Sequence, residues 1–232
     1  KIPSLRGVRI IDGEFGYLRI TNFSNPTAAD LDKALEEFAK KKVRGIVIDL
    51  RNNPGGLLNS AIEVCSRFLK KGELVVYTEG QSARAKQEFH AVDAKKYLDI
   101  PLVLLVNGNS ASAAEIFSGC LQDHNRAVLL GTKTFGKGSV QTVIPLPDKG
   151  AMRLTTAKYY TPSRRVIHGR GITPDIIVPM TPASEAVLAM QLNLAPGEVH
   201  MKNGGGVKDV QLERALELLK GVNLFMKNGN IK

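Results

Sequence analysis

Three short apolar runs, separated by a segment of helical pattern and a polar stretch, constrain the fold of this chain more than any other feature. They are residues 45–50 (GIVIDL), 73–78 (ELVVYT) and 101–106 (PLVLLV). A continuous apolar run is typical of a strand in a sheet that is covered on both faces. Residues 57–70 carry apolar side chains at helical spacing. Strands that alternate with helices predict an α/β core with a mostly parallel sheet.

The composition is that of an ordinary globular domain, and it excludes several function classes. The chain has 232 residues, of which 43% are hydrophobic and 23% charged, enough for one large core with a small appendage. No run approaches the roughly 18 apolar residues of a membrane helix, so no stable membrane insertion is predicted. The net charge is +10, but the basic residues are scattered and do not interleave with aromatic residues. We therefore expect no nucleic-acid groove.

The two cysteines show no metal-binding pattern. Cys65 and Cys120 each lie in an apolar helical pattern, which favours two buried thiols over a disulfide. Because the chain has no zinc-type spacing, neither a metal nor an organic cofactor is predicted.

A turn of small and polar residues follows the apolar run at 101–106. Residues 107–109 (NGN) break the strand, and residues 110–114 (SASAA) open a segment of helical pattern. A serine at such a strand-to-helix turn lies beside free backbone N–H groups, which can hold an oxyanion. Ser110 and Ser112 are both candidates for a nucleophile.

A serine hydroxyl needs a base before it can act as a nucleophile. None of the four histidines stands in a pattern typical of a Ser/His/Asp triad. Lys137 is a better candidate, because the glycines on both sides of it allow close backbone approach. A free lysine has a pKa near 10.4, and a lysine that works as a base needs burial to lower that value towards about 7 to 8. We therefore expect Lys137 to be buried.

Three motifs together resemble those of the C-terminal processing peptidases, also called tail-specific proteases. They are, in chain order, residues 49–56 (DLRNNPGG), 110–116 (SASAAEI) and 134–141 (TFGKGSVQ). The resemblance extends through about residue 179. One departure is Arg164, at a position where the family pattern has glycine.

This resemblance implies roles for five residues. Ser112 is the nucleophile, and Lys137, which follows it by 25 residues as in the family, is the general base. Gln141 orients the lysine amine. The backbone N–H groups of Gly56 and Ala113 form the oxyanion hole.

The resemblance also implies the architecture, a crotonase-like or spiral curled sheet that is mostly parallel and has flanking helices. We divide the chain into a serine peptidase catalytic core at 1–179 and a small C-terminal helical extension at 180–232. In this extension Asp209 can cap a helix that runs through Lys220. The family usually carries a PDZ domain, and we expect none in this chain.

Between the motifs and the extension, three segments have simpler predictions. Residues 127–131 (AVLLG) predict a short strand. Residues 140–146 and 151–159 predict a hairpin around residues 147–150. Residues 79–99 are polar and weakly patterned, which favours a loop.

The implied function is that of a serine endopeptidase with a Ser/Lys dyad, which cleaves proteins near their C-termini. Polypeptide C-termini are the expected partners, bound as an extended strand at an exposed sheet edge. A PDZ domain or adaptor outside this chain is a further partner that the resemblance implies. The implied location is outside the cytoplasm: the periplasm, the cell envelope or the thylakoid lumen. The sequence predicts no particular oligomeric state.

Two alternatives stay open from the sequence alone. A core without its PDZ domain can rest in a misaligned, noncatalytic state and bind peptides or partners. An acyl-transfer enzyme of crotonase type would act on a small thioester and bind coenzyme A, although no adenine-binding pattern is visible.

Overall fold

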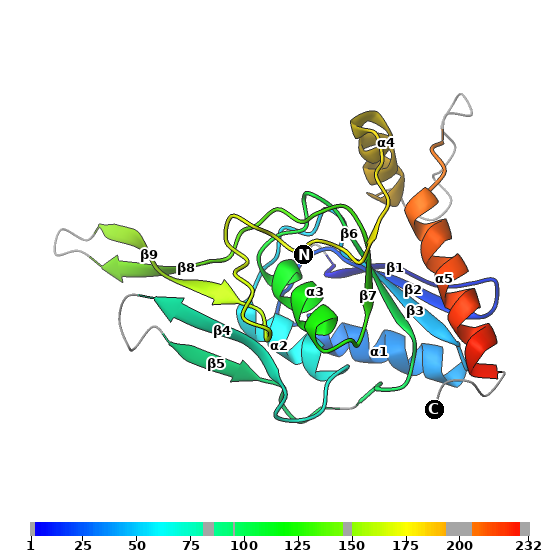
Figure 1. Cartoon of the computed structure of the whole chain (residues 1–232), viewed down its shortest axis with the longest axis horizontal. Helices are drawn as coiled ribbons and strands as arrows, with labels where there is room; N and C mark the ends of the chain where they lie inside the picture. Colours follow the sequence, from blue (N-terminus) through cyan, green and yellow to red (C-terminus); the bar gives the residue numbers. More distant parts are fainter. Residues whose placement is uncertain (1–2, 81–85, 95, 146–149, 194–205, 228–232) are drawn as a thin grey trace.

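The computed structural model describes residues 3–80, 86–94, 96–145, 150–193 and 206–227 (Figure 1). The strands are β1 Leu5–Ile11, β2 Phe15–Ile20, β3 Gly45–Asp49, β4 Leu74–Gly80, β5 Gln87–His90, β6 Leu102–Val106, β7 Val128–Gly131, β8 Ser139–Pro145, β9 Ala151–Tyr160 and β10 Ile176–Ile177. The helices are α1 Thr27–Lys40, α2 Leu58–Ser66, α3 Ala113–Asp123, α4 Pro182–Asn193 and α5 Val210–Lys227. No helix within the described ranges is long and apolar enough to cross a membrane.

The first sheet has, among the described residues, six strands in the order β1-β2-β3-β6-β7-β10. β1 pairs antiparallel with β2, and the other neighbouring pairs are parallel. The strands predicted at 45–50, 101–106 and 127–131 are confirmed as β3, β6 and β7. Their runs are continuously apolar because both faces of this part of the sheet are buried.

Helices cover both faces of the first sheet, and alternate residues of each strand supply the two cores. Ile46 and Ile48 of β3 belong to one buried cluster, which also contains Phe117 of α3 and side chains of α1 and α2. Val47 points to the opposite face, into a second cluster that contains Leu219 of α5. Burial of one such side chain stabilises the fold by about 1.5 to 3 kcal/mol.

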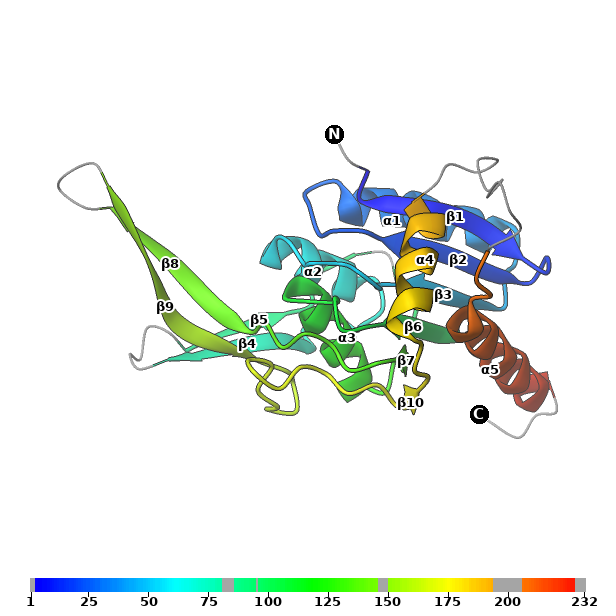
Figure 2. The ribbon, with the colours of Figure 1, turned by 90° about the horizontal axis from the view of Figure 1, so that it is seen from above.

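A second sheet, which the sequence does not predict, is antiparallel and has the strand order β5-β4-β9-β8. The run at 73–78 forms β4 in this sheet and does not join the parallel one. The hairpin predicted from 140–146 and 151–159 is confirmed as β8 and β9, while residues 146–149, which include most of the predicted turn at 147–150, lie outside the described residues. This hairpin extends away from the body of the molecule (Figure 2). Part of the predicted loop at 79–99 is strand β5.

Helix α5, near the C-terminal end of the described residues, packs against the first sheet. α5 lies on the face of the first sheet opposite to α1, where Leu219 contacts Gly45 so closely that a Cβ on this glycine would lie 2.9 Å from Leu219 Cδ2. Asp209 caps α5 as predicted, because its Oδ1 accepts a hydrogen bond from the N–H of Leu212 at 3.0 Å.

The strand order and the helices on both faces of the first sheet confirm the predicted α/β class and its mostly parallel sheet. The crotonase-like detail stays a prediction.

Both cysteines lie in the core between two helices. Cys65 of α2 and Cys120 of α3 are buried and free, as predicted. Burial raises the pKa of the Cys120 thiol well above its usual value, so this thiol is a poor nucleophile.

Candidate active site

Three loops meet at one edge of the first sheet, each after the carboxyl end of a parallel strand. We call them the glycine turn (residues 52–56, after β3), the serine turn (residues 107–112, after β6) and the lysine turn (residues 132–138, after β7). Hydrogen bonds join them, from Ala111 N to Asn53 O at 2.9 Å and from Phe135 N to Ser110 O at 3.0 Å. Ligand sites of open α/β sheets lie outside the carboxyl ends of the strands. The three sequence motifs therefore form one candidate site.

Ser112 stands between the serine turn and α3 in a strained backbone conformation. Its φ is 55° and its ψ is −116°, a combination that residues other than glycine rarely adopt. Such strain costs on the order of 1 to 3 kcal/mol and is concentrated at functional sites. A serine on a sharp strand-to-helix turn presents its hydroxyl beside the helix N-terminus. Ser112 is partly exposed, so a substrate can reach it.

Ser110, the rival nucleophile, has a structural role. Its side chain is 0% exposed, and its hydroxyl donates to the carbonyl of Leu50 at 2.9 Å. The same oxygen accepts a hydrogen bond from the N–H of Asn107 at 3.0 Å. Because this hydroxyl is buried and bonded on both sides, Ser110 fastens the serine turn to the end of β3 and is no longer a candidate nucleophile.

Gly55 allows the glycine turn to lie directly against Ser112. Its φ is 100°, and a Cβ there would lie 2.7 Å from Ser112 Cβ and 2.9 Å from the nitrogen of Ala113. The next residue, Gly56, forms an isolated parallel β-bridge with Phe23. The two hydrogen bonds of this bridge run from Phe23 N to Gly55 O and from Leu57 N to Phe23 O. Within the described residues, the N–H groups of Gly56 and Ala113 make no hydrogen bond. Both N–H groups predicted for the oxyanion hole are thus unbonded beside the glycine turn.

A fully buried glutamate, Glu115, connects the serine turn with the lysine turn. Its Oε2 accepts hydrogen bonds from the N–H of Ser112 at 2.9 Å and the N–H of Lys137 at 2.8 Å. Its Oε1 accepts hydrogen bonds from the N–H of Gly136 at 2.7 Å and the hydroxyl of Thr134 at 2.6 Å. Each of the two carboxylate oxygens thus accepts two hydrogen bonds. Glu115 therefore holds the backbones of both candidate catalytic residues at once.

The sequence-based prediction gives Glu115 no role, although part of its signal is present. Glu115 follows Ser112 by three residues, and a glutamate at this spacing typically binds the N–H of the helix N-cap. The S-x-x-E pattern could have identified this contact. The contacts of Glu115 with Gly136 and Lys137 span 21 and 22 residues, and no local pattern indicates them.

Replacement of Glu115 by glutamine is expected to destabilise the fold by about 3 kcal/mol. The substitution replaces one carboxylate oxygen by an amide –NH₂, which cannot accept a hydrogen bond. Two of the four buried donors therefore lose their acceptor, and each unsatisfied donor costs about 1 to 3 kcal/mol of stability. Urea unfolding measures the loss. The control is Glu63→Gln at an exposed position of α2, which should change stability by less than about 0.5 kcal/mol. Equal stability of the two variants would contradict the role of Glu115.

Lys137 and Gln141 are both exposed, which differs from the burial expected for Lys137. The lysine turn is fastened by backbone bonds to Glu115, and these bonds leave the Lys137 side chain at the surface. The flanking glycines are required, as predicted, because a Cβ on Gly138 would lie 2.5 Å from a backbone nitrogen. Within the described part of the chain, no hydrogen bond joins the side chains of Ser112, Lys137 and Gln141.

A buried ion pair lies next to the glycine turn. Arg51 Nη2 is 2.6 Å from Asp49 Oδ2, which also accepts a hydrogen bond from the Tyr17 hydroxyl at 2.8 Å. Burial raises the pKa of Asp49, but the charge and hydrogen bonds of Arg51 outweigh burial and lower this pKa below its usual value of 3.8. The pair therefore stabilises the fold above that pH, and its contribution is lost as the pH falls through the lowered pKa.

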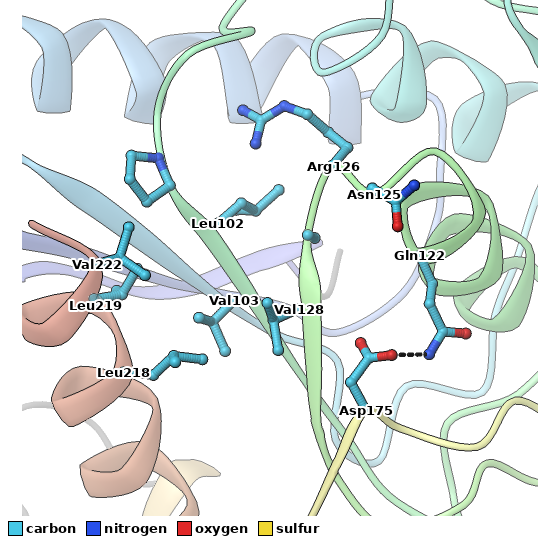
Figure 3. Close-up of a pocket in the computed structure, with 12 residues that line it drawn as sticks. Leu102, Val103, Gln122, Asn125, Arg126, Val128, Asp175, Leu218, Leu219 and Val222 are labelled. Atoms are coloured by element: carbon cyan, nitrogen blue, oxygen red, sulfur yellow. Dashed lines mark hydrogen bonds between the residues drawn. The ribbon is translucent and has the colours of Figure 1, made fainter. Parts of the chain in front are cut away.

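A pocket of about 350 Å³ lies at the opposite end of the first sheet (Figure 3). Its walls include Leu102 at the start of β6, Val128 at the start of β7 and Leu218 of α5. Ser112, Lys137 and the glycine turn do not line it, so it is separate from the candidate site. Among the described residues, no group of three or more His, Cys, Asp or Glu side chains could hold a metal ion.

A comparison with known protein families shows the family to which this chain belongs. The family described as peptidase family S41 matches residues 14–178, a range that contains the glycine, serine and lysine turns. This chain belongs to peptidase family S41. The resemblance expected from the three motifs is confirmed, and the S41 match covers well over half of the chain.

Individual S41 relatives carry names that refer to C-terminal processing. A carboxy-terminal-processing protease of Bartonella bacilliformis is 44% identical over 91% of this chain and 53% of its own length. A carboxyl-terminal-processing protease of Picosynechococcus is 39% identical over 88% of this chain and 45% of its own length. The solved photosystem II D1 C-terminal processing protease is 30% identical, with a TM-score of 0.69 over 77% of this chain and 49% of that one. The chain spans about half the length of these relatives.

Proposed function

We propose that this chain is the catalytic core of a serine endopeptidase that cleaves polypeptides near their C-termini. Ser112 is the nucleophile, Lys137 is the general base and Gln141 orients the lysine amine. The observation that carries the proposal is the strained Ser112, whose backbone is joined through Glu115 to the backbone of Lys137. Membership of family S41 and the names of the relatives support the same reaction.

In the proposed mechanism, the neutral amine of Lys137 takes the proton of the Ser112 hydroxyl as the oxygen attacks the scissile carbonyl carbon. The N–H groups of Gly56 and Ala113 donate to the oxyanion of the tetrahedral intermediate. Loss of one such donor typically costs about 3 to 4 kcal/mol of transition-state stabilisation. Lys137 then returns the proton to the leaving amine. In the second half of the reaction, Lys137 takes a proton from the attacking water and gives it to the Ser112 oxygen as the bond between that oxygen and the acyl group breaks.

The proposed substrate is an extended polypeptide tail that adds to an exposed sheet edge. β8 is an edge strand of the second sheet and begins two residues after Lys137. A tail paired along this edge would run towards the lysine turn. The exposed Phe135, 66% accessible, lies on that turn and offers an apolar contact for a substrate side chain.

Two further parts of the proposal rest on the family resemblance. We place the enzyme outside the cytoplasm, in the periplasm, cell envelope or thylakoid lumen. We also propose that a PDZ domain or adaptor outside this chain delivers the substrate tail. A covering partner of this kind would supply the burial that Lys137 lacks in this chain.

Digestion of an unfolded polypeptide with a free apolar C-terminus tests the proposal. We expect peptides cut near that C-terminus, identified by mass spectrometry, and no cleavage after treatment of the enzyme with a fluorophosphonate, which should label Ser112. Labelling without cleavage would indicate the resting, peptide-binding state. Absence of both cleavage and labelling would contradict the proposed chemistry.

A further inference from the structure

Arg51 directly precedes the glycine turn, and its side chain contacts two residues at the start of α5, Asp209 and Gln211. Arg51 is 2% exposed. Its guanidinium donates five hydrogen bonds, one from each of its five N–H groups. Two go to Asp49 at the end of β3, at 2.6 and 3.0 Å. Two go to Asp209, at 2.7 and 2.8 Å, and one goes to Gln211 at 3.0 Å.

These bonds join elements that lie 158 residues apart in the sequence. Asp209 is the N-cap of α5, so its carboxylate binds both the helix backbone and Arg51. The two oxygens of Asp209 contact the two terminal nitrogens of Arg51, an arrangement that fixes the direction as well as the position of the guanidinium. Gln211 is itself held, because its amide donates to the carbonyl of Val178 at 2.7 Å.

A displacement of Arg51 would also move the glycine turn, because the first residue of this turn, Asn52, follows Arg51 directly and the chain changes direction there. Asn52 has a φ of 59°, in the left-handed region, and its N–H is bonded to Asn107 Oδ1 at 2.9 Å. The turn then leads within four residues to Gly56, whose N–H is assigned to the oxyanion hole. A shift of 1 Å in a catalytic group can reduce a rate by about 100-fold.

We propose that Asp209 is a positioning residue, which acts through Arg51 to hold the glycine turn at the distance from Ser112 that the oxyanion requires. The inference rests on the proposed function and assigns the first residues of α5 to the active-site scaffold. Asp209 touches no substrate in this scheme; its effect reaches the reaction only through the position of Gly56.

The test compares Asp209→Ser with a change at another contact between α5 and the body of the protein. Serine is an equally good N-cap, so α5 keeps its cap, but the side chain is too short to bind Arg51. The control is Lys220→Gln, which removes an exposed 2.8 Å ion pair with Asp12 far from the glycine turn. Asp209→Asn keeps the cap and one acceptor for Arg51, and serves as the conservative variant.

Hydrogen–deuterium exchange and kinetics give two separate results. In Asp209→Ser we expect residues 51–57 to exchange about tenfold faster, and kcat to fall about 10- to 100-fold with KM nearly unchanged. Lys220→Gln should match the wild type in both, and Asp209→Asn should lie between. Wild-type exchange and kcat in Asp209→Ser, or equal effects in Lys220→Gln, would overturn the inference. If the wild-type protein neither cleaves the polypeptide nor takes the fluorophosphonate label, the proposed function fails, while the exchange of residues 51–57 still decides whether Asp209 acts on the glycine turn.

Discussion

Replacing Ser112 with alanine is expected to reduce the cleavage rate by roughly 10⁶-fold, the loss seen when a serine nucleophile is removed. Alanine has no oxygen that can form the acyl-enzyme, so only binding and the oxyanion donors remain. The fold should tolerate the change, because the hydrogen bond that ties this residue to Glu115 is made by its backbone N–H. The rate is measured from the release of peptides from an unfolded polypeptide, and the fold from a thermal melt.

Ser110→Ala is the matched control, because it removes the neighbouring hydroxyl. This hydroxyl bonds the carbonyl of Leu50 and the N–H of Asn107. Its loss should reduce stability by about 1 to 3 kcal/mol while cleavage stays measurable. Abolished cleavage in Ser110→Ala together with retained cleavage in Ser112→Ala would reverse the assignment of the nucleophile.

Replacing Lys137 with arginine is expected to reduce cleavage by roughly 10²- to 10⁴-fold, the contribution of a positioned acid–base group. An arginine remains protonated at every pH that the protein tolerates, so it cannot take the Ser112 proton. In the wild type, cleavage should rise with pH, because only the neutral amine acts as a base. Rates measured across a pH series would show this rise in the wild type and not in Lys137→Arg.

Lys133→Arg is the control for this change, since Lys133 is an exposed lysine on the same turn. We expect it to keep the wild-type rate and pH profile. If Lys137→Arg also kept the wild-type rate, the Ser/Lys dyad would be wrong, and another base would have to be sought near Ser112.

The parts of the fold that the sequence predicts are those whose pattern is local. β3, β6 and β7 are continuous apolar runs because helices bury both faces of their sheet. The antiparallel second sheet was not predicted, since the pairing of β4 with β9 joins Tyr77 to Tyr160 across a long stretch of chain. No local pattern distinguishes a strand that joins the parallel sheet from one that joins a separate sheet.

In the candidate site, too, the sequence predicts the residues that lie in local motifs and not the contacts between segments that are distant in the chain. Ser112, Lys137 and the glycine turn lie in motifs that identify the family from the sequence. The buried contacts of Glu115 and Arg51 are formed only when distant segments meet, so the sequence left them without a role. Burial of Lys137 was expected from its chemistry, and the structure shows that the exposed lysine turn does not supply it.

The packing of α5 means that the folding unit is larger than the family signature. A fragment cut after residue 178 would retain every motif and the whole matched region. It would also uncover the apolar residues that α5 shields, namely Phe15, Tyr17, Val47, Val103, Leu105 and Leu130. Exposed apolar surface of that kind promotes aggregation. Expression boundaries chosen from the family match alone would therefore leave this apolar surface uncovered, and we expect a soluble fragment to need α5.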